Sequence, residues 1–192
     1  WMSTTNGLFK FEPQTGVFTN YTEADGLQGD EFNQDAYFLS ESGEMFFGGT
    51  NGFNYFYPES IQANTNVPVI AITNFKIFGI PEKFDKRFDK KGESRIRLEY
   101  WQNHFSFEFT ALEYTNPVNN RYAYKMEGFD SDWIFCGVRR HATYTNLDGG
   151  DYVFRVMGSN SDGIWNTEGL SVHITIKPPF WQTWWFRLLL AL

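Results

Sequence analysis

The sequence predicts an all-β chain in which a partial β-propeller segment precedes an antiparallel β-sandwich. Three observations predict this class: a short segment that occurs twice, a series of segments in which apolar and polar residues alternate, and an aromatic-rich composition. Aromatic residues make up 20% of the 192 residues and apolar residues 42%, which suits strands better than helices. A chain of this length holds one or two modest domains.

The N-terminal prediction rests on an internal repeat. Residues 5–13 (TNGLFKFEP) and 50–58 (TNGFNYFYP) share Thr, Asn, Gly and Pro at the same positions. Repeats of about 40–50 residues built from short strands are typical of propeller blades. Residues 1–60 therefore predict antiparallel hairpins amounting to about one to one and a third blades. Because a propeller needs several blades to close, we expect this chain to be a piece of a longer protein.

A polar stretch without periodicity, residues 61–67, is interpreted as a linker to a second domain at residues 68–178. In that domain apolar and polar residues alternate with the period of two that strands with one buried face show. About seven or eight such strands predict an immunoglobulin- or fibronectin-III-like sandwich. The predicted strands are 69–78, 95–100, 105–110, 122–126, 133–135, 142–145, 152–156 and 172–176. The residues expected to face the core are Phe105, Phe107, Phe109, Tyr152, Phe154 and Val156.

The turn before the strand that starts at Tyr152 carries a more specific signal. Residues 147–152 read LDGGDY, and a Tyr that follows such a corner at a strand start fits a tyrosine corner, whose hydroxyl bonds back to upstream backbone. Tyr152 is equally compatible with a plain core position, and both interpretations predict the same fold.

Several segments of the second domain form a tyrosine-rich pattern: 112–117 (LEYTNP), 121–133 (RYAYKMEGFDSDW), 142–147 (ATYTNL), 150–156 (GDYVFRV) and 160–165 (NSDGIW). This pattern resembles the Y_Y_Y domain, and the repeats before it resemble the regulator-propeller repeat. The matching motif residues, expected to be structural, are Tyr122, Tyr124, Trp133, Tyr144, Tyr152 and Trp165. Together, the two parts resemble the end of the periplasmic sensor of hybrid two-component systems, common in polysaccharide-degrading gut Bacteroidetes.

This resemblance implies a function in signalling. Two propellers would precede the chain, and one membrane helix, a histidine kinase, a receiver and a DNA-binding domain would follow it. The chain would be the membrane-proximal, signal-transmitting part of the sensor, at the periplasmic face of the inner membrane and within a homodimer. The parent protein would sense an oligosaccharide that this part does not itself bind. The alternative is a carbohydrate-binding or accessory module that stacks Trp133, Tyr144 or Trp165 on sugar rings, although Trp133 suits a core position better.

The C-terminus agrees with a membrane-proximal position. Pro178 and Pro179 end the last predicted strand and form the expected signal junction, and aromatic residues then precede an apolar run. Such an aromatic cluster is typical of a membrane interface. Residues 179–192 are therefore predicted to start a truncated transmembrane helix, since they are too short to span a bilayer, which takes about 20 apolar residues. A C-terminal helix packed on the domain is the alternative.

Charge and composition exclude several other functions. Residues 1–60 carry one Lys against nine acidic residues, which argues against nucleic acid as a partner because phosphate binding needs clustered Lys and Arg. Residues 83–97 mix both signs and are interpreted as a solvated loop. The single cysteine, Cys136, excludes an intrachain disulfide.

No catalytic residue, cofactor or metal site is predicted. The chain has no Gly-rich phosphate loop and no GxSxG motif, and its histidines, His104, His141 and His173, are scattered singly. Asp130 and Asp132 beside Trp133 resemble a glycosidase acid/base pair. A turn in which the Asp side chain bonds its own backbone is the favoured interpretation of these two residues.

Overall fold

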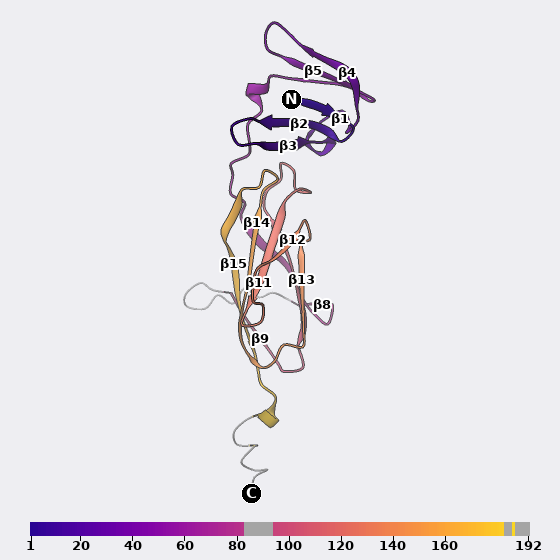
Figure 1. Cartoon of the computed structure of the whole chain (residues 1–192). Coiled ribbons are helices and arrows are strands. Elements are labelled where there is room, and N and C mark those ends of the chain that lie inside the picture. Colours follow the sequence, from indigo (N-terminus) through magenta and orange to yellow (C-terminus); the bar gives the residue numbers. More distant parts are fainter. Residues whose placement is uncertain (83–93, 183–185, 187–192) are drawn as a thin grey trace. The chain divides into compact units, whose positions relative to one another are not determined.

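The computed structural model describes residues 1–82, 94–182 and 186, and its regular elements are β-strands and short 3-10 helices (Figure 1). This confirms the all-β prediction. The chain separates into two compact units, Trp1–Ala63 and Asn64–Leu192, and each is described by itself.

The N-terminal unit contains two three-stranded antiparallel sheets, one for each copy of the sequence repeat. Their strands are β1 (Met2–Thr4), β2 (Gly7–Glu12) and β3 (Val17–Tyr21), then β4 (Phe32–Leu39), β5 (Met45–Gly49) and β6 (Gly52–Phe56). Two short 3-10 helices, η1 (Glu23–Asp25) and η2 (Pro58–Ser60), follow these sheets in turn. A small core joins the two sheets through the buried side chains of Leu8, Phe32 and Phe47.

The two repeat copies form the same hairpin in the same register. Thr4 faces Gly7 across the first turn as Gly49 faces Gly52 across the second. Both turn glycines take a left-handed conformation, with φ of 96° at Gly7 and 126° at Gly52, which residues with a Cβ rarely adopt. A Cβ on Gly7 would also lie 2.0 Å from the carbonyl oxygen of Tyr21. The repeated Asn-Gly pair is therefore a turn requirement in both copies.

The second unit is built from two packed sheets. One has the strand order β13-β10-β7-β8 and the other β12-β11-β14-β15-β9. Their strands are β7 (Ile70–Ile77), β8 (Ile80–Glu82), β9 (Ser94–Leu98), β10 (His104–Ala111), β11 (Arg121–Glu127), β12 (Ile134–Gly137), β13 (His141–Thr145), β14 (Gly150–Ser159) and β15 (Trp165–Ile176). A short 3-10 helix, η3 (Phe180–Gln182), follows the last strand.

A single aromatic core lies between these two sheets. Phe107 of β10 stacks on Phe154 of β14 with ring centroids 4.3 Å apart, so the two sheets meet face to face. Phe105, Phe107 and Phe109 are all fully buried, and so are Phe154 and Val156. This confirms the predicted register, since a shift of one residue would turn every one of these side chains to the other face. Tyr152 is half-buried and packs against the core.

Three details of the second unit differ from the sequence-based expectations. Strand β9 pairs with β15 in parallel, with Ser94 opposite Val172, although only antiparallel pairing was expected. Strand β9 ends at Leu98, so Tyr100 lies beyond it. Residues 94–97 of the predicted loop belong to this strand, and the rest of that loop, residues 83–93, lies outside the described residues. Alternation shows which side chains are buried, but it does not show the direction of the neighbouring strand.

Candidate functional site

The tyrosines of the family motif hold surface loops onto the core. Tyr122 is fully buried, and its hydroxyl accepts a hydrogen bond from the Ala111 N–H at 3.1 Å. The hydroxyl of Tyr124 accepts one from Nη2 of Arg139 at 3.1 Å, and the same guanidinium lies over its ring. Burial is the main cause that raises the pKa of Tyr124. Each ring packs in the core while its hydroxyl fixes a backbone or loop position.

Tyr144 fixes the turn that contains Asp130. Its hydroxyl donates to Oδ2 of Asp130 at 2.7 Å, and the same oxygen accepts the Met126 N–H at 2.7 Å. Burial, then the hydrogen bond and charge of Asp130, raise the pKa of Tyr144 well above its ordinary value. Asp130 therefore bonds its own turn, as the favoured interpretation expected, while Asp132 is exposed.

Tyr152 makes the hydrogen bond that a tyrosine corner predicts. Its hydroxyl donates to the carbonyl oxygen of Asp148, four residues upstream, at 3.1 Å. Burial, then the nearby charge of Asp148, raise the pKa of this hydroxyl. The bond holds the turn at residues 148–150, which contacts the end of the last strand.

The two motif tryptophans lie outside the core. Trp133 is half-buried and is not part of the core cluster, so its expected core position is wrong. It precedes β12, an edge strand of its sheet, where a side chain has fewer neighbours. Trp165 is also half-buried and meets the exposed Phe135 edge-on at 5.8 Å. The structure therefore brings the tyrosines together in one core and leaves both tryptophans at its margin.

The chain leaves the sandwich through a fixed junction. After β15 the Lys177 N–H donates to the Leu98 carbonyl at 2.9 Å, and the Lys177 ammonium pairs with Glu99. Pro178 lies directly against Gly149, because a Cβ on that glycine would be 2.6 Å from Cα of Pro178. Pro179 is buried.

Aromatic rings continue this junction to η3. Tyr100 meets Trp181 edge-on at 5.2 Å, and Phe180 meets Phe186 at 5.3 Å. Sequence reasoning found Pro178 and Pro179 but missed Gly149, Glu99 and Tyr100. The Gly-Gly pair at 149–150 was the available signal for the close approach, whereas nothing in the sequence connects Glu99 with Lys177.

The predicted membrane helix falls largely outside the described residues, which end with 180–182 in η3 and the single position 186. No helix in the described part of the chain has the length and apolar character needed to cross a membrane. Within residues 1–82, 94–182 and 186, no group of three or more His, Cys, Asp or Glu side chains could hold a metal ion.

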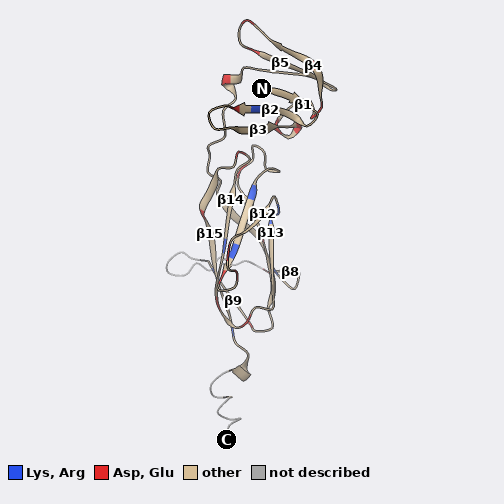
Figure 2. Ribbon diagram, in the orientation of Figure 1, with Lys and Arg blue, Asp and Glu red and all other residues tan. Residues whose placement is uncertain are grey.

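Lys and Arg positions and Asp and Glu positions are scattered along the ribbon, in strands and in turns (Figure 2). Two ion pairs join neighbouring strands in the described part of the chain, Lys76 with Glu108 and Arg155 with Glu127. The hydrogen bond from Lys76 is the main cause that lowers the pKa of Glu108. These pairs belong to solvated sheet faces rather than to a concentrated charged site.

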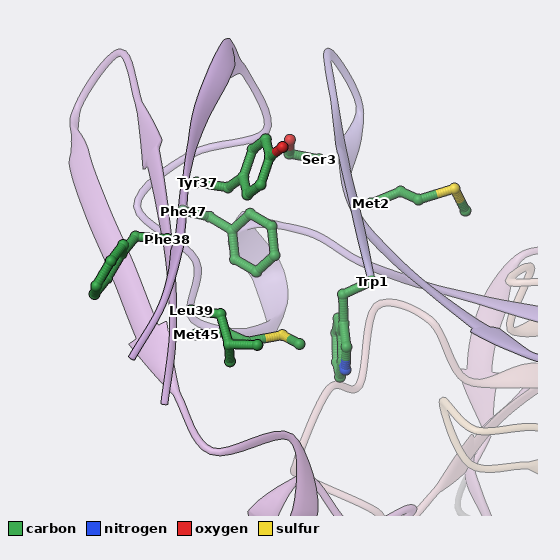
Figure 3. A pocket seen from close by; sticks show the side chains of 8 residues that line it. All are labelled: Trp1, Met2, Ser3, Tyr37, Phe38, Leu39, Met45 and Phe47. Atoms are coloured by element: carbon green, nitrogen blue, oxygen red, sulfur yellow. The ribbon is translucent and has the colours of Figure 1, made fainter. Parts of the chain in front are cut away.

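An apolar hollow of about 400 Å³ lies in the N-terminal unit. Its wall combines Trp1 and β1 with β4 and β5, and its only hydroxyl groups are those of Ser3 and Tyr37. Figure 3 shows the Tyr37 ring pointing toward Ser3, and Trp1 and Met45 on facing sides of the hollow. Because no Asp, Glu, His, Cys, Lys or Arg side chain lines the hollow, it offers shape and apolar contact rather than acid–base chemistry.

Comparison with known proteins gives a domain match within the second unit. Residues 113–177 match the Y_Y_Y domain. Over its whole length the chain is 32% identical to Histidine kinase P4 of Formosa agariphila, and it spans 14% of that protein.

Solved structures show the same fold. The extracellular domain of the hybrid two-component system BT3049 from B. thetaiotaomicron superposes with a TM-score of 0.73 at 24% identity, over 92% of this chain and 24% of that one. The corresponding domain of BT4673 from the same organism gives 0.52 at 25% identity, over 94% and 24%. The chain as a whole is therefore similar to the extracellular sensor region of hybrid two-component systems and spans about a quarter of these structures.

Proposed function

We propose that this chain is the membrane-proximal, signal-transmitting part of the extracytoplasmic sensor of a hybrid two-component histidine kinase. The observation that carries the proposal is the similarity of the entire chain to a histidine kinase that is much longer than the chain. In this proposal residues 1–60 are blade repeats of a propeller, and the Y_Y_Y unit is an immunoglobulin- or fibronectin-III-like sandwich that follows them. The parent protein regulates polysaccharide utilisation and senses an oligosaccharide outside this chain.

The junction geometry supports a role in transmission. A proline fixes its own φ near −65°, and a following proline confines the residue before it to extended conformations. Pro178 also packs on the backbone of Gly149, and Lys177 is held by Leu98 and Glu99. A segment restrained in this way moves with the sandwich. Rotation or separation of two sandwiches in a homodimer then reaches the segments that lead to the membrane.

One of the three residues that the alternative, a sugar-binding module, would use for stacking is buried. Tyr144 is 4% exposed, so neither face of its ring is free to stack on a sugar. Because the proposal places sugar sensing outside this chain, isolated protein is expected to show no heat of binding when titrated with oligosaccharide digests of plant and algal polysaccharides.

The test replaces Pro178 and Pro179 by Gly-Gly in the full-length receptor. Transcription of the regulated genes is measured while cells are exposed to a graded polysaccharide digest, with Pro13→Gly, at an exposed turn in the repeat, as the matched control. The double variant should bind the digest components but lose or blunt the response, and the control should respond normally. An unchanged dose–response curve for the double variant would refute transmission through a stiff junction.

A further inference from the structure

One buried carboxamide fastens the segment that enters the sandwich. Asn160 is 1% exposed, and its Nδ2 donates to the carbonyl oxygens of Asn64 at 2.6 Å and Asn66 at 3.0 Å. Its Oδ1 accepts the N–H groups of Asp162 at 3.1 Å and Ile164 at 2.9 Å. A carboxamide has two donors and two acceptor sites, and all four are used here.

The oxygen and the nitrogen of the Asn160 side chain bond different segments of the chain. The oxygen holds the turn between β14 and β15, whereas the nitrogen holds residues that lie almost one hundred positions earlier in the chain. The assignment of oxygen and nitrogen follows from the partners, because backbone N–H groups can only donate and carbonyl oxygens can only accept.

Asn166 repeats the same division a short distance along the hairpin. Its Nδ2 donates to the Pro68 carbonyl at 2.9 Å, and its Oδ1 accepts the Gly169 N–H at 2.9 Å. Both amides therefore hold the hairpin with their oxygen and the incoming segment, residues 64–68, with their nitrogen.

Side chains of the incoming segment complete the attachment. Nδ2 of Asn64 donates to Oε1 of Glu113 at 3.1 Å, and the Asn64 N–H donates to Oδ2 of Asp162. The Glu113 side chain is itself nearly buried and accepts the Thr115 hydroxyl at 2.6 Å. The incoming segment is thus tied to the sandwich from Asn64 onward, although its sequence was interpreted only as a polar linker.

The β14–β15 hairpin connects this attachment to the junction at the other end. Asn160 follows the last residue of β14, and Gly149, which contacts Pro178, precedes its first. Strand β15 runs alongside, from Trp165 to Ile176, and is paired with β14 over most of its length. Ten residues of strand span about 33 Å, so a single paired hairpin reaches from the incoming segment to the outgoing one.

From this arrangement we infer that Asn160 and Asn166 are positioning residues, which make the β14–β15 hairpin the element that carries movement through the sandwich. The inference rests on the proposed signalling function. Displacement of the repeats would pull on residues 64–68, pass through the two amides to the hairpin, and leave through Pro178. In that case only the few residues before Asn64 would be free to bend between the two units.

The experiment uses Asn160→Asp and Asn166→Asp, which keep an acceptor for the turn but remove the donors to the incoming segment. Asn119→Asp is the matched control, because Asn119 is exposed and its side chain makes no hydrogen bond with the described residues. In the isolated 192-residue chain, Asn160→Asp should accelerate hydrogen exchange at the amides of Asn64 and Asn66 about tenfold, as expected for the loss of one or two hydrogen bonds. Exchange in β10 should stay unchanged.

The same variants are then placed in the full-length receptor and exposed to the polysaccharide digest. We expect Asn160→Asp and Asn166→Asp to lower the maximal transcriptional response at least threefold, and Asn119→Asp to leave it unchanged. Should Asn160→Asp fail to fold, Asn166→Asp provides the same test with one bond to the incoming segment removed.

The outcomes separate the inference from the function on which it rests. Unchanged exchange at Asn64 and Asn66 would show that the amides do not fasten the segment. Faster exchange with a wild-type response would refute transmission through the hairpin, while loss of response in the Pro178-Pro179 variant would still support the proposed function. If the amide variants and the proline variant all gave a normal response, the inference about the hairpin and the proposed function would both be overturned.

Discussion

Replacing Gly149 by Ala should force apart the two segments that meet at the outgoing junction. The new Cβ would lie 2.6 Å from Cα and 2.9 Å from N of Pro178, whereas carbon atoms pack at about 3.5–4.0 Å. Pro178 would therefore have to move by about 1 Å against the restraints on its neighbour Lys177. Overpacking of this kind costs about 1–3 kcal/mol, from which a Gly-to-Ala change recovers about 0.4–1 kcal/mol through the unfolded chain. A net destabilisation of about 1.3 kcal/mol, within a range of about 0–2.6 kcal/mol, is expected.

The adjacent Gly150 supplies the matched control. A Cβ there would meet only ring atoms of Tyr152, at 3.6 Å and beyond, so Gly150→Ala should be neutral or stabilising by up to about 1 kcal/mol. Urea unfolding followed by tryptophan fluorescence is a suitable assay, because of the seven tryptophans only Trp1 lies in the N-terminal unit. Equal effects of the two substitutions would refute the close contact between Gly149 and Pro178.

Three further predictions concern the sandwich. Phe107→Ala should destabilise it by about 3–5 kcal/mol, because a fully buried ring stacked on Phe154 is removed; a loss below about 1 kcal/mol in urea unfolding would contradict the core position. Tyr152→Phe should cost about 0.5–1.5 kcal/mol by removing the corner hydrogen bond, and thermal unfolding that matches wild type would show the bond to be unimportant. Burial raises the pKa of Glu113, but hydrogen bonds from Thr115 and others outweigh it, so the pKa is lowered. A carboxyl with a lowered folded-state pKa adds stability above its unfolded pKa of about 4.3. That stability is lost as the pH falls below this value. Unfolding free energies measured from pH 7 to pH 3 should fall less steeply for Glu113→Gln than for wild type, and parallel curves would contradict this role.

Local patterns in the sequence were sufficient to predict the core strands. Alternation in β10 placed Phe105, Phe107 and Phe109 correctly, because a period of two leaves only two possible faces and one of them is polar. The internal repeat likewise predicted antiparallel hairpins, and in the structure both copies turn at a glycine in the left-handed conformation.

Contacts between residues distant in sequence could not be predicted in this way. Nothing near Asn160 indicates that its side chain binds backbone about one hundred positions upstream, because an Asn in a turn usually bonds its own backbone. Trp133 was misplaced for a related reason. Its size favours burial, but its position beside an edge strand limits how much of it can be covered.

The parallel pair of β9 and β15 has a consequence for the order of folding. Ser94 of β9 faces Val172 of β15, so a strand made early in synthesis finds its partner only when the last strand has been made. Pairing over such a separation is slow, because closing the long intervening loop has a large entropic cost. Until then both edges of β9 are open to other chains, whereas afterwards only its outer edge is, because β9 is the end strand of its sheet. The nascent sandwich therefore depends on its final strand, and a chain cut before Trp165 should aggregate rather than fold.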